Sequence, residues 1–306
     1  MAEVRFDRQA VLVTGAGRGV GRATALLVAA RGGRVVVADN GAAKDGSDTQ
    51  EGPAAAVVGE IVATGGEAVA CSADLATTEG CAAAVAASID AFGGIDAIAH
   101  FASPCPPLKA PDALVAADLE LVFRVSVQGG LWLARSAWGV LAAQQRGRIV
   151  LATSAGAYGA ANNADYSSVK AAVIGAARCL AVDGAAHGIR VNAIAPAART
   201  RMNDGFHPGA FAEWFARTMG AERVAPGAAY LLSDACAVSG ETFVLGGGRV
   251  ARIALAESEG LVGAGDSVEG VRDGMAALMA DERWFRPRDL AERTARVAAM
   301  LGFDDN

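Results

Sequence analysis

Cysteine and histidine are few in this sequence and lie far apart. Its 306 residues include five cysteines and three histidines, with no Cys-x-x-Cys pair and no histidine at ligand spacing. The odd, scattered cysteines give no disulfide framework either, so we expect free thiols and no metal site. The residues concerned are Cys71, Cys81, Cys105, Cys179, Cys236, His100, His187 and His207.

Long apolar runs and basic clusters are also missing. No uninterrupted apolar stretch approaches the roughly 18 residues that a membrane-spanning helix needs. Residues 1–7 lack the basic-then-apolar order of a signal peptide. The formal net charge of −6 attracts neither phosphate backbones nor anionic lipid. These absences predict a cytoplasmic protein without nucleic-acid or membrane partners.

Short runs rich in Val, Ile and Ala alternate with longer, Ala-rich stretches of helical length. The alternation is typical of βαβ units, and strands that are apolar throughout indicate a sheet covered on both faces. We therefore predict an α/β fold, a doubly wound, seven-stranded parallel sheet with helices on both faces. The predicted strands are 10–14, 34–38, 67–72, 95–100, 147–152, 190–194 and 241–245, and the predicted helices are 20–31, 53–64, 78–92, 112–143, 164–186 and 226–233.

The pattern changes after Gly248. Residues 1–248 carry the alternating segments, whereas 249–306 contain two further predicted helices, at 267–280 and 287–301. A tail of this length is too short for a core of its own. We predict a main catalytic domain, 1–248, and a helical extension, 249–306, that packs on it or on a neighbouring subunit.

A glycine-rich segment follows the first predicted strand and opens the next helix. Glycine allows a tight turn, leaves room for a pyrophosphate and presents free N–H groups at the positive end of the helix dipole. The segment therefore predicts a Rossmann-type dinucleotide site. It runs Thr14-Gly15-Ala16-Gly17-Arg18-Gly19-Val20-Gly21, with Gly15, Arg18, Gly19, Val20 and Gly21 as candidate cofactor contacts.

The second predicted strand ends at Asp39, eighteen residues past Gly21. A carboxylate there accepts the ribose hydroxyls of NAD and repels the 2′-phosphate of NADP, so we predict NAD as the cofactor. Arg18 weakens this preference, because an arginine in the glycine loop can bind a phosphate. Asp74 and Leu75, just past the third strand, are predicted to lie beside the adenine ring; a helix N-terminal carboxylate is the alternative for Asp74.

Tyr166 and Lys170 are four residues apart and project from one face of a predicted helix. A cation beside a tyrosine stabilises the phenolate and lowers its pKa from about 10, which makes abstraction of an alcohol proton feasible near neutral pH. We predict that Tyr166 is a general base and that Lys170 tunes it. A solvated helix face is the alternative.

The glycine pattern, Asp39 and the Tyr166/Lys170 pair together resemble the short-chain dehydrogenase/reductase family over residues 8–248. Within it, several stretches resemble the (3R)-hydroxyacyl-CoA dehydrogenase part of peroxisomal multifunctional enzymes and their bacterial relatives, some of which act on steroids. The resemblance implies an NAD-dependent enzyme that interconverts a secondary alcohol and a ketone, and a homodimer or homotetramer joined through helices 112–143 and 164–186. The similar stretches are 37–41, 164–167, 191–196 and 199–202.

The resemblance also implies roles for single residues. The family carries a hydroxyl thirteen residues before the tyrosine, a place that Thr153 occupies, with Ser154 as the fallback if the loop is one residue shorter. Either hydroxyl would donate to the substrate oxygen. Lys170 would also bond the nicotinamide ribose. Pro196 and Thr200 belong to the cofactor site, although the glycine that usually follows the proline is absent.

Two departures from the family pattern lie beside the predicted site. After the fourth strand, His100-Phe101-Ala102-Ser103 replaces the usual Asn-Asn-Ala-Gly and alters the floor beneath the nicotinamide ribose. His100 can replace a hydrogen bond or join the chemistry; a satisfied structural histidine is the favoured alternative. On the long helix, Ser126 replaces an asparagine that often holds a water linking the lysine to solvent.

Aromatic residues gather in the segment 199–220. We interpret them as an apolar lid over a bulky substrate, such as a 3-hydroxyacyl-CoA or a steroid-like alcohol; ordinary helix packing is the alternative. Two further functions stay open, a non-redox NAD-binding sensor or scaffold and a pathway-specific ketoreductase of secondary metabolism. The apolar residues are Phe206, Phe211, Trp214, Phe215 and Met219, and Arg199, Arg201 and Arg217 either meet the phosphates of CoA or lie on the surface.

Overall fold

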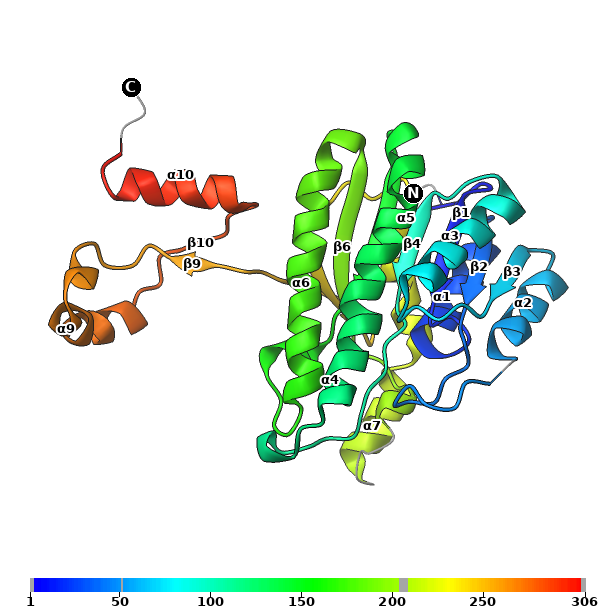
Figure 1. Cartoon of the computed structure of the whole chain (residues 1–306), viewed down its shortest axis with the longest axis horizontal. Helices are drawn as coiled ribbons and strands as arrows, with labels where there is room; N and C mark the ends of the chain where they lie inside the picture. Colours follow the sequence, from blue (N-terminus) through cyan, green and yellow to red (C-terminus); the bar gives the residue numbers. More distant parts are fainter. Residues whose placement is uncertain (1–2, 51, 204–208, 304–306) are drawn as a thin grey trace. The chain divides into compact units, whose positions relative to one another are not determined.

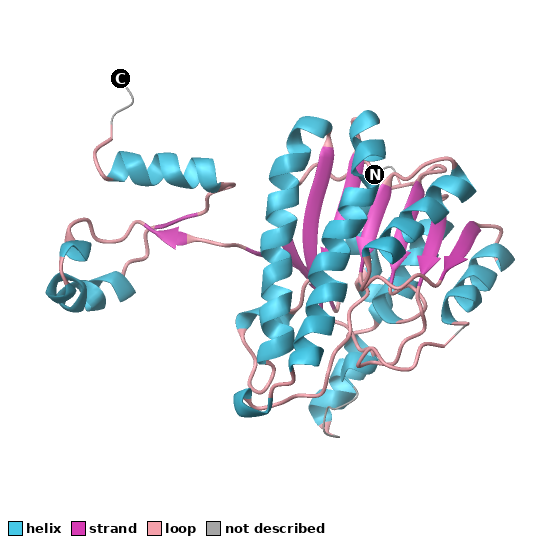
Figure 2. Cartoon of the chain, in the orientation of Figure 1, coloured by secondary structure: helices cyan, strands magenta, loops and turns pink. Residues whose placement is uncertain are grey.

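The computed structural model describes residues 3–50, 52–203 and 209–303. The chain divides into two compact units, Met1–Arg252 and Ile253–Asn306. The first contains a layered α/β structure, in which Figure 2 shows the strands of the sheet in magenta and the helices in cyan. Within the described ranges no helix combines the length and apolarity that crossing a membrane requires.

An eight-stranded sheet forms the centre of the first unit. Its strands are β1 (Ala10–Thr14), β2 (Arg34–Ala38), β3 (Glu67–Cys71), β4 (Ala97–His100), β5 (Gly147–Ala152), β6 (Ile189–Pro196), β7 (Thr242–Gly246) and β8 (Arg249–Ile253). They lie in the order β3-β2-β1-β4-β5-β6-β7-β8, and β1 to β7 are parallel. The order changes direction between β1 and β4, the place where such sheets bind ligands. Thr14 pairs with both Ala38 and His100, so three strands end together there.

Helices cover both faces of this sheet (Figure 1). β1 places Val11 and Val13 in one core and Leu12 in the other, as the two-residue period of a strand requires. This two-sided burial confirms the predicted doubly wound fold and explains why the strands are apolar throughout. The core with Val11 contains α1 (Gly19–Ala30), α2 (Pro53–Ala63) and α8 (Ala225–Leu232); the core with Leu12 contains α3 (Thr78–Phe92), α5 (Gly129–Ala143) and α6 (Ala164–Gly184).

The sheet has one strand more than the seven predicted. β8 follows β7 after only two residues, Gly247 and Gly248, whose φ angles are +58° and +82°. Two residues with positive φ form the tight turn that joins antiparallel neighbours, so β8 returns alongside β7. The first unit therefore extends to Arg252, past the predicted boundary at Gly248.

The predicted helix 112–143 is interrupted in the structure. A 3-10 turn (Pro111–Ala113) and α4 (Ala116–Phe123) precede a π-helical turn, Arg124–Gln128, after which α5 begins. The N–H of Gly129 donates to the Arg124 carbonyl, five residues back, which is the bond that defines a π-helix. The turn thus inserts one extra residue where Ser126 lies, and such turns occur frequently at functional sites.

The second unit contains two short helices and a pair of two-residue strands. Both helices begin at a side-chain cap, where Ser267 accepts from the N–H of Gly270 and Asp289 from the N–H of Glu292. How this unit packs on other parts of the protein stays a prediction. The elements are β9 (Glu257–Ser258), α9 (Val268–Met279), β10 (Trp284–Phe285) and α10 (Leu290–Met300), with β9 and β10 antiparallel.

Candidate active site

The glycine loop joins β1 to α1 where the strand order changes direction. Gly15 has a φ of +62°, and a Cβ added to it would lie 2.8 Å from the Ala102 nitrogen. A Cβ on Gly21 would lie 2.2 Å from the Gly15 carbonyl oxygen, so both positions exclude a larger residue. A Cβ on Gly19 would meet Thr200 at 3.2 Å. The loop therefore brings four predicted cofactor residues and Thr200 together.

The N-terminus of α1 is open to an anion. Its N-cap residue, Arg18, provides no side-chain cap, and the first turn carries no acidic residue. Nη1 of Arg18 is buried without a hydrogen-bond partner. Free N–H groups, the positive end of the helix dipole and an orphaned guanidinium nitrogen all fit a phosphate-bearing cofactor. Val20 instead packs against the core.

Asp39 turns its carboxylate toward the glycine loop. Oδ2 accepts the N–H of Gly17 and Oδ1 accepts the N–H of Gly41, both at 2.8 Å. A Cβ on Gly17 would lie 2.9 Å from Oδ2, so a larger residue in the loop would displace the carboxylate. Each oxygen keeps a further lone pair. The group therefore fits a ribose with two free hydroxyls.

Asp74 and Leu75 follow β3 and differ in exposure to solvent. Asp74 is exposed, and its carboxylate accepts the Ala76 N–H at 3.0 Å, which forms a turn just before Thr77, the N-cap of α3. Leu75 is buried in the core beneath α3. The structure thus agrees with the helix-leading alternative for Asp74, and the adenine contact stays a prediction.

His100 ends β4 and is buried. Its Nε2 lies 2.8 Å from the Val125 carbonyl, and its Nδ1 lies 2.9 Å from the Thr14 hydroxyl. A carbonyl only accepts, so Nε2 carries the proton and Nδ1 accepts from Thr14. Burial lowers the pKa of His100 to about 4, and the ring is therefore neutral near pH 7.

Thr14 extends this network to the chain beneath the predicted nicotinamide. Its hydroxyl oxygen accepts the N–H of Phe101 at 3.1 Å and that of Ala102 at 3.2 Å. Both ring nitrogens of His100 are therefore satisfied, as the structural alternative expects. Hydrogen bonds with Thr14 and Val125 therefore hold the segment that replaces Asn-Asn-Ala-Gly.

Lys170 is 2% exposed on α6. Its Nζ donates to the Ala152 carbonyl at 3.0 Å and to Ser126 Oγ at 3.4 Å, and lies 5.4 Å from the centre of the Tyr166 ring. The third N–H has no partner among the described residues. Burial lowers the pKa of Lys170 to about 7. The amine can therefore gain or lose its proton near neutral pH.

The phenol of Tyr166 behaves differently from the prediction. Burial raises the pKa of Tyr166 to about 12, the Cys105 thiol also raises it, and a hydrogen bond with the Ser154 side chain lowers it. The predicted lowering is wrong for the protein alone, because the loss of hydration dominates and Lys170 is not among the groups that shift the pKa of this phenol. The phenol of Tyr166 is therefore protonated near pH 7 in the protein alone.

The two candidate hydroxyls have different surroundings. Thr153 is buried, its N–H donates to the Ile194 carbonyl at 2.8 Å, and its Oγ1 donates to the Lys170 main-chain carbonyl at 2.6 Å. Thr153 thus extends the hydrogen bonding of β5 with β6, and its hydroxyl proton is used in a hydrogen bond within the protein. Ser154 is half-buried and accepts the N–H of Gly156 at 3.1 Å. This geometry favours Ser154, the fallback, over Thr153.

Two residues beside the site have contacts that the sequence does not reveal. Ser103 Oγ lies 2.9 Å from Ser126 Oγ. The Cys105 thiol influences the pKa of both Tyr166 and Lys170, and burial raises the pKa of the thiol itself. No sequence signal separates Cys105 from the other four cysteines. Only the course of the chain after β4 brings both residues here.

The aromatic segment forms a short helix, α7 (Ala210–Thr218), with no buried side chain. Phe211 is 61% exposed and Trp214 is 42% exposed, and their ring centres lie 5.7 Å apart. Phe215 lies 5.9 Å from Phe211. An exposed aromatic cluster fits a lid better than ordinary helix packing. Phe206 and His207 lie outside the described residues.

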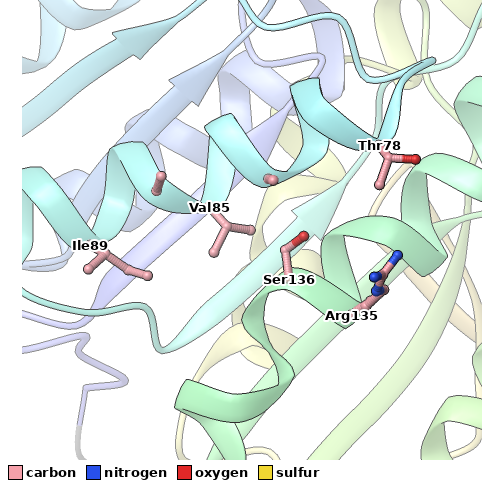
Figure 3. A pocket seen from close by; sticks show the side chains of 7 residues that line it. Thr78, Val85, Ile89, Arg135 and Ser136 are labelled. Carbon is pink, nitrogen blue, oxygen red and sulfur yellow. The ribbon is translucent and has the colours of Figure 1, made fainter.

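A surface depression lies between α3 and α5 (Figure 3) and contains none of the predicted site residues. Its floor is largely apolar, with Arg135 and Ser136 on the α5 side. Over the described part of the chain, no group of three or more His, Cys, Asp or Glu residues could hold a metal ion. The full lining is Thr78, Ala82, Val85, Ala86, Ile89, Arg135 and Ser136.

Residues 9–208 match the family model described as short chain dehydrogenase. The chain belongs to the short-chain dehydrogenase family. It is therefore an NAD(P)-dependent oxidoreductase that acts on CH–OH groups. A short-chain type dehydrogenase/reductase of Mycobacterium tuberculosis is 36% identical over 251 residues, covering 82% of this chain and 86% of that one.

Two further relatives bear on the predicted branch of the family. Peroxisomal multifunctional enzyme type 2 of Mus musculus is 31% identical over 303 residues; the match covers 97% of this chain but only 40% of the mouse enzyme. The structure of a 7α-hydroxysteroid dehydrogenase with NADH and 7-oxo glycochenodeoxycholic acid has a TM-score of 0.70 and 30% identity, covering 80% of this chain and 95% of that one. The predicted resemblance to the multifunctional enzymes is confirmed.

We expect the variant His100→Asn to reduce the loss of stability at acid pH. The folded-state pKa of about 4 lies below the ordinary value of 6.5, so between these values the unfolded chain binds more protons. Folding stability then falls as the pH falls through this window, by at most about 1.4 kcal/mol per pH unit. Urea midpoints of wild type, His100→Asn and the control His187→Asn, measured from pH 7 to pH 4.5, test this. A wild-type advantage over His100→Asn that stays constant with pH contradicts it.

Proposed function

We propose that the protein interconverts a secondary alcohol and a ketone on a bulky apolar substrate, with NAD, and that Tyr166, Lys170 and Ser154 act on the substrate and cofactor. One observation carries the proposal. Tyr166 lies beside Lys170 and hydrogen-bonds Ser154, and Ser126 and Ser103 join Lys170 to the segment that packs against the glycine loop, where the N-terminus of α1 lacks a cap. The acid–base pair Tyr166 and Lys170 thus lies beside the predicted nucleotide site.

In the oxidation direction, Tyr166 takes the hydroxyl proton while Ser154 donates to the substrate oxygen and holds it. When bound, oxidised nicotinamide supplies the hydride acceptor and a positive charge. Lys170 contributes its own charge below its pKa of about 7 and offers its third N–H to the ribose. Since burial raises the pKa of Tyr166 to about 12, the phenolate depends on these positive charges.

Exposed aromatic residues support a bulky substrate. Phe211 and Trp214 on α7 present apolar rings to solvent in the segment after β6. One relative is named a peroxisomal multifunctional enzyme, and the structure of another contains an oxidised bile acid. We propose a 3-hydroxyacyl-CoA or a steroid-like alcohol as the substrate class. The exposed Arg199 and Arg217 would suit the phosphates of CoA.

We also propose NAD rather than NADP, and assembly through α5 and α6. The Asp39 carboxylate faces the glycine loop, where a 2′-phosphate would add like charge. The orphaned Nη1 of Arg18 opposes this preference or serves the pyrophosphate. Trp138 on α5 and His187, in the 3-10 turn that follows α6, form an edge-to-face pair with ring centres 6.4 Å apart. Family resemblance makes the face of α5 and α6 the contact between copies.

We expect the variant Tyr166→Phe to lose turnover by at least about 10²–10⁴-fold, the usual contribution of a general acid–base group. NADH affinity should stay nearly unchanged, because the aromatic ring remains. The measurement is NADH absorbance with NAD and a panel of secondary alcohols and 3-hydroxyacyl-CoAs. The control is Tyr158→Phe, whose tyrosine is 71% exposed. Retained turnover in Tyr166→Phe refutes the assignment, and wild-type protein that binds NADH but oxidises no alcohol favours the sensor.

The two hydroxyls can be separated by Ser154→Ala and Thr153→Val. We expect Ser154→Ala to lower kcat by roughly 10²-fold, because the developing oxyanion loses its donor. Thr153→Val should keep kcat within a few-fold but lower the free energy of unfolding by about 1–3 kcal/mol, since the Lys170 carbonyl loses a buried donor. Steady-state kinetics and urea unfolding of both variants provide the measurement. The opposite pattern would return the substrate contact to Thr153.

Removing the Asp39 carboxylate should change the cofactor preference. We expect Asp39→Ala to raise NADPH affinity relative to NADH by at least about tenfold, a change of about 1.4 kcal/mol, because the repulsion of the 2′-phosphate disappears. Quenching of tryptophan fluorescence gives both dissociation constants. Adding Arg18→Gln then identifies the arginine's partner: a loss for NADPH alone indicates the 2′-phosphate, and an equal loss for both indicates the pyrophosphate. An unchanged ratio in Asp39→Ala contradicts the NAD assignment.

A further inference from the structure

Two residues that depart from the family pattern at distant places in the sequence lie against each other in the structure. Ser103 takes the place of the glycine after β4, and Ser126 takes the place of the helix asparagine. Their hydroxyl oxygens are 2.9 Å apart. Ser126 Oγ is also one of the two hydrogen-bond acceptors of the Lys170 ammonium. The two departures therefore form one connected group with Lys170.

The direction of this hydrogen-bond chain is fixed by its ends. An ammonium only donates, so Ser126 Oγ accepts from Lys170 Nζ at 3.4 Å. The Pro104 carbonyl only accepts, so Ser103 Oγ donates to it at 3.0 Å. The single arrangement that satisfies both ends has the Ser126 hydroxyl donating to Ser103. All donors in the chain thus point away from Lys170.

The hydrogen bonds of His100 and Thr14 hold the two serines of this hydrogen-bond chain in place. Ser126 lies in the π-turn, and the neighbouring Val125 carbonyl is bound by His100 Nε2 at 2.8 Å. Ser103 follows β4 by three residues, on the segment that Thr14 anchors through the N–H groups of Phe101 and Ala102. Both serines are therefore attached to rigid parts of the fold.

Burial decreases along this chain of hydrogen bonds, from Lys170 to Ser103. Lys170 and Ser126 are each 2% exposed, whereas Ser103 is half-buried. The other acceptor of Lys170, the Ala152 carbonyl, has no proton to pass on. Among the described residues Ser126 is the only side chain that hydrogen-bonds Lys170 Nζ. Among the described residues, the serine pair is thus the one path of hydroxyl groups from the buried Lys170 ammonium toward the surface.

We propose that Ser126 and Ser103 conduct protons between Lys170 and solvent during turnover, an inference that rests on the proposed function. In the oxidation direction the Lys170 ammonium gives a proton to Ser126 Oγ as the Ser126 proton moves to Ser103 Oγ. The Ser103 proton passes to a solvent water, and the neutral Lys170 amine takes up the proton that Tyr166 has removed from the alcohol, which restores the ammonium and the phenolate. Each hydroxyl ends with one proton, as it began. For ketone reduction the sequence runs in reverse.

The test uses Ser103→Ala and Ser126→Ala in the full chain, assayed with NAD and a secondary alcohol or 3-hydroxyacyl-CoA that the wild type oxidises. We expect kcat to fall by about tenfold or more, less than for a direct acid–base group, with KM and NADH affinity unchanged. The solvent deuterium isotope effect on kcat should rise, since proton release becomes slower. Ser103→Thr keeps a hydroxyl and should restore most of the rate.

Ser88→Ala is the matched control, because it removes a buried hydroxyl that donates to the Gly94 carbonyl at 2.8 Å, away from the site. If Ser126→Ala disturbs the π-turn, the half-buried Ser103→Ala still tests the path. Wild-type kcat and isotope effect in Ser103→Ala overturn the proposal but leave the proposed function intact. A wild type that oxidises no alcohol overturns both, because the path then has no reaction to serve.

Discussion

The burial of one ammonium, that of Lys170, sets requirements for everything around it. A cation this far from water is tolerated only when acceptors replace its hydration. Its two acceptors come from distant parts of the chain, the Ala152 carbonyl at the end of β5 and Ser126 in the π-turn. The lowered pKa of about 7 shows that the replacement is incomplete. A strand end and a helix irregularity are thus both tied to the needs of one side chain.

His100 illustrates how a departure from a family pattern can be balanced within the fold. An imidazole has one donor and one acceptor when neutral, and here the Val125 carbonyl and the Thr14 hydroxyl use both. Gly129 and Gly130 make room for the ring, since a Cβ on either would approach it within 3.4 Å. Burial keeps the ring neutral, which preserves this pattern of bonds. The altered segment is therefore a different solution to the same structural task.

The features that depend on local sequence pattern are predicted well. Continuous apolar runs located seven strands because a sheet buried on both faces requires them, and the glycine loop and Asp39 follow from local geometry. β8 is not among the predicted strands, and the Gly247–Gly248 turn that brings it alongside β7 lies at the predicted domain boundary. The contact of Ser103 with Ser126, and the preference for Ser154 over Thr153, depend on how separate segments pack. No spacing rule contains that information.

The direction of the Tyr166 pKa was missed for a related reason. Proximity to Lys170 is visible in the sequence, but the loss of hydration is a property of the folded protein. In the protein alone the tyrosine is therefore a neutral phenol near pH 7. The sequence spacing predicts which side chains are neighbours but not how far each is removed from water.

The π-turn at Arg124–Gln128 also has a consequence for the phase of the helix that contains it. One added residue rotates everything beyond it by about 100° around the helix axis relative to a regular α-helix. Positions in α4 and α5 that a continuous heptad or 3.6-residue pattern would assign to one face therefore lie on different faces. Loss of a single residue between Arg124 and Gln128 would remove this rotation and change which faces of α4 and α5 point the same way. The register between the two helices thus depends on the length of the turn that contains Ser126.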